Sequence, residues 1–391
     1  MPVAKVGTHS KAIAGLLVAA GMLAAGGMLA LRPGDGAAAR LDGPKVSRGF
    51  VVSWFHMTAY SQDSDCPQGL NLPADRLFAR IYRELGKSPA EVAKRVAEFP
   101  SGPGIAEAAN RGRIDGKPVN VYRYPEAVPD PQIKTVLGGK AFGFDLDNNP
   151  STGGFVEPVT GQPGIDDQLY RAFGCFGTMR GVPPARPTTP SVAWDVIRDH
   201  SPAWVMEITG LDDVRNDPDI EIGIYRAYEP VARNAQGESQ ADLTFRIDPT
   251  PRLQNRVHGH IKDGVLESDP FDFTMLGDPY AMVEYEFHEA HLRLTPTEDG
   301  GLKGILGGYH PWLPIYTSYA LAGAAFEVNL SLDLPGMYYA LKKMADADPD
   351  PATGQNRQIS ATYAMELIPA YLRHSDDTAA RPLAQATEPA R

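Results

Sequence analysis

The sequence predicts a mainly β, α+β protein, in which an antiparallel β-sandwich or barrel-like core lies between helical N-terminal and C-terminal segments. Apolar and polar residues alternate in several short runs of the middle region, and Asp-Gly pairs separate some of these runs. The 391 residues include 39 Gly and 35 Pro, roughly a fifth of the chain, whereas roughly 12% is average. A chain that turns this often cannot form a long helical bundle or coiled coil.

The segment 40–118 is predicted to be mainly helical. An apolar run at 50–54 is typical of a strand. Leu77, Ile81 and Leu85 follow at helical spacing, which predicts a helix over 73–85. Ser88 and Glu91 form the pattern of a capping box with Pro89 between them, so a second helix is expected over 89–99.

The region 119–310 is predicted to be the β-rich core. Alternating apolar residues stand at 220–224, 243–247 and 271–275. Asp263-Gly264 lies between two strand-like runs and predicts a tight hairpin, and Asp299-Gly300 predicts another turn. Several short strands joined in this way are typical of an antiparallel sandwich or barrel.

Beyond the core, the segment 311–374 is predicted to be helical and to pack on the sheet. Apolar residues recur at helical spacing within 314–328, and Pro335 is placed where the first turn of a following helix tolerates proline. The final residues, 375–391, are polar and rich in Ala and Pro, so a disordered tail is expected.

Residues 1–39 have the features of a signal peptide. Lys5 and Lys11 precede an uncharged run at 12–31, and Ala37-Ala38-Ala39 supplies the small residues of a cleavage site. The run is long enough to be an uncleaved anchor instead, and contact with a membrane is expected only in that case. Either alternative predicts an exported protein, periplasmic or extracellular.

The two cysteines, Cys66 and Cys175, are predicted to form a disulfide. A single pair in an exported chain is oxidised by default. Two free buried thiols are the alternative. The chain has neither a CxxC nor a CxxCH motif, which argues against thiol–disulfide chemistry and covalent haem attachment.

Two acidic loops share one pattern and are candidate calcium sites. Residues 145–153 read D-x-D-x-N-P-x-T-G, and residues 346–354 read D-x-D-x-D-P-x-T-G. Alternate oxygen ligands in a tight loop suit Ca²⁺, although the Gly and Glu of an EF-hand are absent. The alternative is that these residues only initiate turns. The candidate ligands are Asp145, Asp147, Asn149, Asp166, Asp167, Asp346, Asp348 and Asp350.

Histidines and a glutamate provide a candidate transition-metal site. The candidate ligands for a Zn, Fe or Cu ion are His258, His260, Glu286, His288 and His291. The alternative is that His258 and His260 face outward, since Val257 and Ile261 have the parity of the core. The core side of the second segment switches near His288, as at a β-bulge.

Aromatic residues near position 312 are candidates for binding a ligand. Tyr309, Trp312 and Tyr316 could stack on a sugar or line an apolar pocket, or they could pack a helix against the sheet. The sequence contains no GxSxG, Walker A or GxGxxG motif.

These observations favour an exported, disulfide-linked, calcium-braced protein that binds an unknown ligand or partner in the cell envelope. The net charge of −11 argues against a nucleic acid as that partner. One alternative is a metal-dependent hydrolase or oxidoreductase with a His/Glu site on the β core. Another is a structural envelope protein.

Overall fold

The computed structural model describes residues 46–151, 154–181, 185–278 and 282–374. The predicted signal peptide, or anchor, at 1–39 and the predicted tail at 375–391 therefore lie outside the described residues. None of the helices within the described ranges has the length and apolar character needed to cross a membrane.

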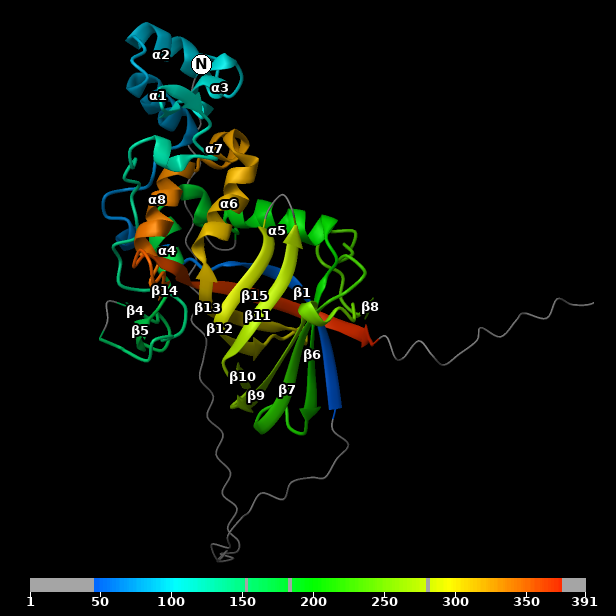
Figure 1. Cartoon of the computed structure of the whole chain (residues 1–391). Coiled ribbons are helices and arrows are strands. Elements are labelled where there is room, and N and C mark those ends of the chain that lie inside the picture. Colours follow the sequence, from blue (N-terminus) through cyan, green and yellow to red (C-terminus); the bar gives the residue numbers. More distant parts are fainter. Residues whose placement is uncertain (1–45, 152–153, 182–184, 279–281, 375–391) are drawn as a thin grey trace, which may run out of the picture. The chain divides into compact units, whose positions relative to one another are not determined.

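Eight antiparallel strands form a closed barrel, which decides between the two predicted architectures in favour of the barrel (Figure 1). In their order around the barrel, the strands are β1 (Val46–Met57), β6 (Trp204–Leu211), β7 (Asp217–Arg226), β9 (Gln254–Lys262), β10 (Val265–Ser268), β12 (Met282–Pro296), β13 (Leu302–Pro311) and β15 (Asn356–Arg373).

The barrel closes where β15 pairs with both β13 and β1. The pairing of β15 with β1 runs from Gly49 opposite Ala370 to Met57 opposite Tyr363. The first strand is therefore built from the segment predicted to be mainly helical, as 50–54 indicated. The last strand corrects the prediction for 311–374, because 356–373 form a strand and only the first part of this segment is helical.

The remaining strands extend or flank the barrel. β11 (Phe271–Asp278) pairs with β12, whereas β8 (Thr244–Arg246) and β14 (Ala347–Pro349) pair with β15. Two small hairpins lie outside the barrel: β2 (Gly112–Ile114) with β3 (Lys117–Val119), and β4 (Phe155–Val156) with β5 (Pro163–Ile165).

A β-bulge in β12 confirms the predicted switch of the core side. The pairing of β12 with β13 shifts register between His288 and His291, and Glu289 has a φ of 51°. Phe287 and Ala290 are consequently both buried, although a regular strand would place them on opposite faces. Both predicted hairpins are also present, with Asp263-Gly264 between β9 and β10 and Asp299-Gly300 between β12 and β13.

The helices gather at one end of the barrel and on its flank (Figure 1). They are α1 (Ala74–Glu84), α2 (Pro89–Ala97), α3 (Pro103–Ala109), α4 (Gln168–Phe173), α5 (Thr188–His200), α6 (Trp312–Ala322), α7 (Ala324–Leu330) and α8 (Leu334–Met344). The α5, α6 and α8 helices contact barrel strands, whereas α1 and α3 pack against α7.

Local sequence accounts for several of these helix ends. Ser88 and Glu91 form the predicted capping box of α2, in which the Ser88 side chain accepts from the Glu91 N–H. Pro335 stands in the first turn of α8, as predicted. Gly323, with a φ of 52°, divides the predicted helix over 314–328 into α6 and α7.

Aromatic side chains fill the helix-covered end of the barrel. Phe55 lies at 5.1 Å from Trp204, 5.3 Å from Tyr285 and 5.0 Å from Tyr363, measured between ring centroids. These four residues are buried and belong to the largest apolar cluster among the residues that the structure describes. Since α5 and α6 pack against this end, the core continues from the barrel into the helices.

The predicted disulfide joins Cys66 to Cys175. Both residues are buried in a small cluster with Val136, Phe155 and Tyr170, apart from the main core. The disulfide therefore fastens the chain that follows β1 to the chain that follows α4.

Replacing both cysteines with alanine should lower the free energy of unfolding by about 2–5 kcal/mol, because the unfolded chain gains the freedom of a long loop. Urea unfolding of the oxidised protein and of the Cys66→Ala, Cys175→Ala variant measures the difference. The wild type under reducing conditions should resemble the variant, and the variant should be insensitive to reductant. Equal midpoints for all forms would contradict the stabilising role of the disulfide.

Candidate functional site

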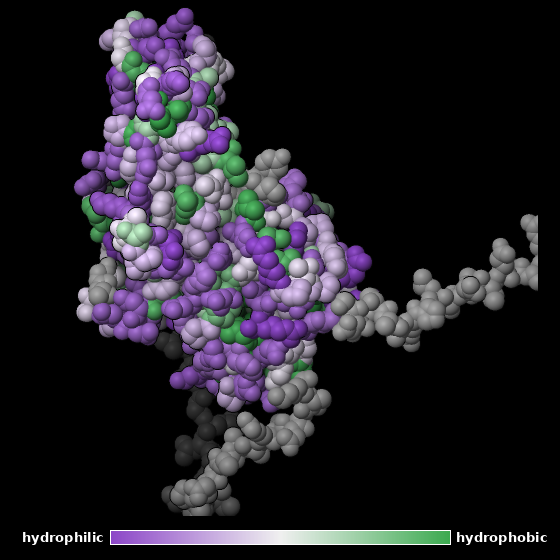
Figure 2. All heavy atoms as spheres, viewed as in Figure 1, coloured by the Kyte–Doolittle hydropathy of each residue, from purple (hydrophilic) through white to green (hydrophobic). Residues whose placement is uncertain are grey.

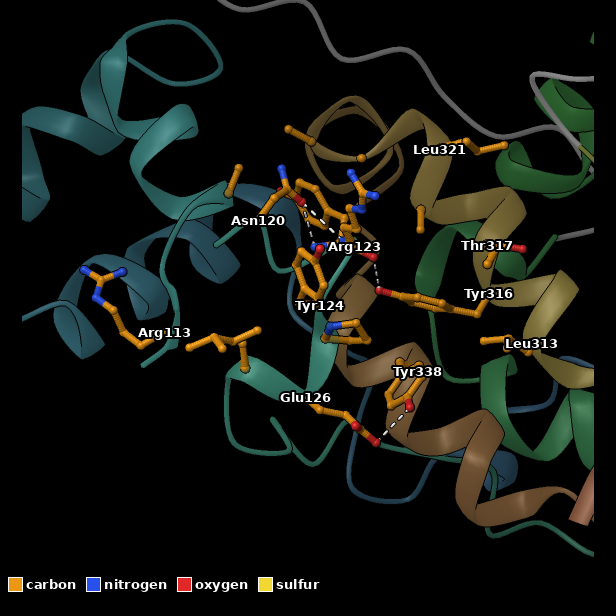
Figure 3. A pocket seen from close by; sticks show the side chains of 18 residues that line it. Arg113, Asn120, Arg123, Tyr124, Glu126, Leu313, Tyr316, Thr317, Leu321 and Tyr338 are labelled. Atoms are coloured by element: carbon orange, nitrogen blue, oxygen red, sulfur yellow. Dashed lines mark hydrogen bonds between the residues drawn. The ribbon is translucent and has the colours of Figure 1, made fainter. Parts of the chain in front are cut away.

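A groove of about 1280 Å³ lies between the segment 109–127 and the helices α6 and α8 (Figure 3). We call it the tyrosine groove. The residues that line it include Arg113, Asn120, Tyr122, Arg123, Tyr124, Glu126, Leu313, Tyr316, Thr317, Leu321 and Tyr338. They come from parts of the chain that are roughly 200 residues apart, so tertiary contacts assemble the groove.

One wall of the tyrosine groove contains two tyrosine rings in contact with each other, and a hydrogen bond holds one of them in place. The rings of Tyr316 and Tyr338 lie 5.1 Å apart in an edge-to-face arrangement. The Tyr316 hydroxyl donates to the carbonyl oxygen of Tyr122 at 2.8 Å, and thereby ties α6 to the opposite segment. This wall is therefore largely preformed.

A buried carboxyl group is hydrogen-bonded to one of the lining tyrosines, Tyr122. Glu327 in α7 accepts hydrogen bonds from the Tyr122 hydroxyl at 2.7 Å and from the Leu334 N–H at 3.1 Å. Burial raises the pKa of Glu327 to about 7, against the charge of Arg111 and both hydrogen bonds, which favour the ionised form. The carboxyl therefore titrates near neutral pH.

Basic side chains outnumber acidic ones along the tyrosine groove. The Arg113 guanidinium donates to backbone carbonyls, and the Arg123 guanidinium lies over the Tyr124 ring at 5.7 Å. Neither forms an ion pair with a carboxylate of the described residues. Glu126 is already neutralised, since the Lys342 ammonium lies 2.6 Å from its carboxylate. The groove is thus locally positive in a chain whose net charge is −11.

Exposed apolar side chains lie beside these charges. Leu313 is 48% exposed, Leu321 is 68% exposed, and Ile114 on the other side is 43% exposed. Figure 2 shows hydrophobic residues at the surface over α6, on a face that is otherwise mostly hydrophilic. A partner with apolar groups would remove this surface from water.

The first acidic loop brings three carboxylates together. Oxygens of Asp145, Asp147 and Asp166 lie within 4.8 Å of one another, and we call this group the acidic cluster. Burial, together with the charge of Asp147, raises the pKa of Asp166 to about 6, against hydrogen bonds from the N–H groups of Leu146 and Asp147. Carboxylate oxygens at this separation suit a hard divalent cation such as Ca²⁺.

The second acidic loop does not form a matching group among the described residues. Asp346 accepts from the Ser360 N–H and hydroxyl, both at 2.7 Å, whereas Asp348 is paired with Arg357. Asp350 accepts hydrogen bonds from N–H groups within its own turn. This matches the alternative prediction, in which the acidic residues only initiate turns. Asp346 nevertheless lies close enough to the acidic cluster to raise the pKa of Asp166.

Two other candidate calcium ligands have local roles. Asp167 caps α4, accepting from the Tyr170 N–H at 3.0 Å, and also accepts from the Thr58 hydroxyl. The Asn149 side chain accepts from the N–H and hydroxyl of Ser151 at the turn. Both residues support the loops around the acidic cluster.

The candidate transition-metal ligands do not converge within the described residues, where the three-residue group with metal-binding geometry is the acidic cluster. His258 is 70% exposed beside Asp219, and His260 lies beside Glu267, so both face outward as the alternative proposed. Glu286 and His288 do meet, at 3.0 Å. His291 instead stacks on Phe144 at 5.4 Å.

Of the three candidate ligand-binding aromatics, Tyr316 alone lines the tyrosine groove. Trp312 is not among the lining residues; its ring lies 5.4 Å from that of Tyr338, and its indole N–H donates to the Asn356 carbonyl. Tyr309 instead lies near the acidic cluster. Burial raises the pKa of Tyr309, and the charges of Asp166 and Asp346 add to this rise. Trp312 therefore matches the alternative prediction, in which these aromatic residues pack a helix against the sheet.

Sequence reasoning missed the opposite side of the tyrosine groove, which comprises Arg113, Tyr122, Arg123 and Tyr124. The run from 121 to 124 alternates aromatic and basic or apolar residues, and this was the only local signal. This run indicates a binding groove only when the structure is known, because α6 then lies across from the run.

Comparisons with family models, with curated proteins and with solved structures give no match to this chain.

Replacing Glu327 with Gln should remove a pH dependence of stability. Because the pKa of Glu327 is raised, the native state keeps a proton that the unfolded state releases, so stability is lost as the pH rises from about 4.5 through 7. The Glu327→Gln variant should gain about 1–3 kcal/mol relative to the wild type between pH 5 and pH 8. Urea unfolding at both pH values measures this.

Glu298→Gln, in the turn between β12 and β13, is the matched control and should show no such gain. A Glu327→Gln difference that is equal at pH 5 and pH 8 would contradict the titration of this carboxyl group.

Proposed function

We propose that this chain is an exported binding protein whose tyrosine groove takes an acidic segment of a partner polypeptide. The observation that carries the proposal is that two arginines, Arg113 and Arg123, line one groove together with exposed leucines in an acidic chain. An acidic partner with apolar side chains complements both features.

The size and shape of the groove favour a polypeptide over a small molecule. Its volume of about 1280 Å³ exceeds the roughly 300–1,000 Å³ of typical small-molecule pockets. Apolar anchors on two sides, Ile114 on one and Leu313 and Leu321 on the other, suit a peptide with spaced apolar side chains. The hydrogen-bonded wall would lower the ordering cost of binding.

Export is supported by two independent features. The cysteine pair is joined, and disulfides persist in oxidising compartments rather than in the cytosol. Residues 1–39 have the composition of a signal peptide. We accordingly place the partner in the cell envelope or outside the cell.

We further propose that the acidic cluster binds one calcium ion. Three carboxylates within 4.8 Å repel one another, and a divalent cation would offset this repulsion. The ion would brace the loop that carries Asp145 and Asp147 against Asp166. Because millimolar Ca²⁺ is common outside the cell, a weak site would be occupied there.

A fluorescent 12-residue peptide containing Glu and Leu at helical spacing is the probe for the tyrosine groove. It should bind the full chain with micromolar affinity by fluorescence anisotropy, and a peptide with Lys in place of Glu should bind at least tenfold more weakly. The Arg113→Ala, Arg123→Ala variant should lose about tenfold in affinity, and Leu321→Ser should also weaken binding.

Arg252→Ala, an exposed arginine at the barrel, is the control and should bind as the wild type does. Equal affinity for the Glu and Lys peptides, or wild-type affinity of the double variant, would overturn the proposed groove function.

Calcium should raise the melting temperature of the protein, and Asp147→Asn should abolish this rise. At a hundredfold excess over Kd, one site stabilises by about 2.7 kcal/mol. The effect should fall below pH 6, because Asp166 becomes protonated and a protonated carboxyl is a poor ligand. Thermal unfolding in Ca²⁺, in Mg²⁺ and in a chelator measures this.

Asp219→Asn, at an exposed position of β7, should keep the calcium response. A rise that survives in Asp147→Asn, or one that Asp219→Asn removes, would show that calcium acts elsewhere.

A further inference from the structure

The barrel has a second opening at the end away from its helix cover. The β1 strand reaches both ends: it contributes Phe50 to this opening, whereas its His56 lies among residues of α5, α6 and α7 at the other end. The turns between β6 and β7, β9 and β10, and β12 and β13 surround the opening. We call this space, of about 480 Å³, the barrel mouth.

The space exists because the residues inside the barrel change along its length. Aromatic rings fill the helix-covered end. Near the mouth, the inward residues are mainly aliphatic, and Ile208, Ile261, Leu266 and Leu302 are buried while lining the space. An eight-stranded barrel is just wide enough for its side chains or one small ligand, so smaller side chains leave room for the ligand.

The rim of the barrel mouth is charged. Arg48 from β1 and Arg215 from the turn between β6 and β7 line it, with Asp263 as the one acidic lining residue. Neither arginine forms an ion pair among the residues that the structure describes. The rim is therefore net positive, above walls that are predominantly apolar.

We infer that the barrel mouth binds a linear amphiphile with one anionic head group. The hydrocarbon chain would lie along the aliphatic walls, and the head group would accept hydrogen bonds from Arg48 and Arg215. A neutral apolar molecule would make no use of the two guanidinium groups, which are exposed to water at the rim. A polypeptide segment would need its backbone hydrogen bonds satisfied within a space that offers apolar walls.

This site is independent of the tyrosine groove. The barrel mouth and the groove share no lining residue, and their arginines lie on different elements. Failure of one proposal therefore leaves the other intact, and the groove variants serve as controls.

Calorimetric titration of the full chain with dodecanoate, below its micelle concentration, tests the inference. One molecule should bind per chain, and dodecanol should bind at least tenfold more weakly. Affinity should rise by about three- to fourfold per added methylene until the space is full. Dodecyl phosphate is the second anionic probe, and the tighter of the two identifies the head group as a carboxylate or a phosphate.

Two variants place the ligand in the barrel mouth. Arg48→Ala, Arg215→Ala should weaken dodecanoate about tenfold without changing dodecanol. Val265→Trp should fill the space and abolish binding of both probes. Its matched control is Val283→Trp, which adds the same ring to an exposed position of β12. Unchanged melting temperatures would show that each variant folds.

The inference is overturned if dodecanol binds as tightly as dodecanoate, or if dodecanoate does not bind. It is also overturned if the arginine pair or Val265→Trp leaves binding unchanged while Arg113→Ala, Arg123→Ala removes it, since the amphiphile would then occupy the tyrosine groove.

Discussion

The antiparallel pairing of β1 with β15 is the constraint on which the rest of the structure depends. It joins strands from the two ends of the described chain, with Gly49 opposite Ala370 and Met57 opposite Tyr363. Without it, both strands would present an unpaired edge, and the sheet would have no closed interior. Closure also defines two distinct ends, one covered by helices and one open at the barrel mouth.

The helix-covered end depends on this closure because its packing surface consists of strand ends that the barrel brings together. The α6 helix follows β13 directly and contacts β12 and β15, so the position of its Tyr316 is set by three strands. The hydrogen bond from Tyr316 to the Tyr122 carbonyl then fixes the segment opposite. The tyrosine groove is thus an indirect consequence of how the barrel closes, and the disulfide between Cys66 and Cys175 stabilises a separate part of the same assembly.

Much of the local structure could be predicted from the sequence. The capping box at Ser88, the Asp263-Gly264 hairpin and the bulge near Glu289 each depend on neighbouring residues, whose backbone preferences act at short range. The strand at 356–373 was missed although buried apolar residues alternate along it from Ile359 to Leu367, and its pairing partners are far away in sequence. The similar acidic loops at 145 and 346 were expected to act alike, yet in the first loop two carboxylates converge with Asp166, whereas in the second Arg357 and Ser360 engage two of the three.

The β-rich class, the turns, the cysteine pair and the loops that carry carboxylates could all be predicted, because composition and short-range spacing encode these features directly. Tertiary contacts establish that the sheet closes, that the candidate histidine ligands do not converge, and that Arg113 and Arg123 line the same groove as Tyr316. These outcomes depend on contacts between residues that are hundreds of positions apart. Such contacts are selected by the burial of the whole core rather than by any local preference.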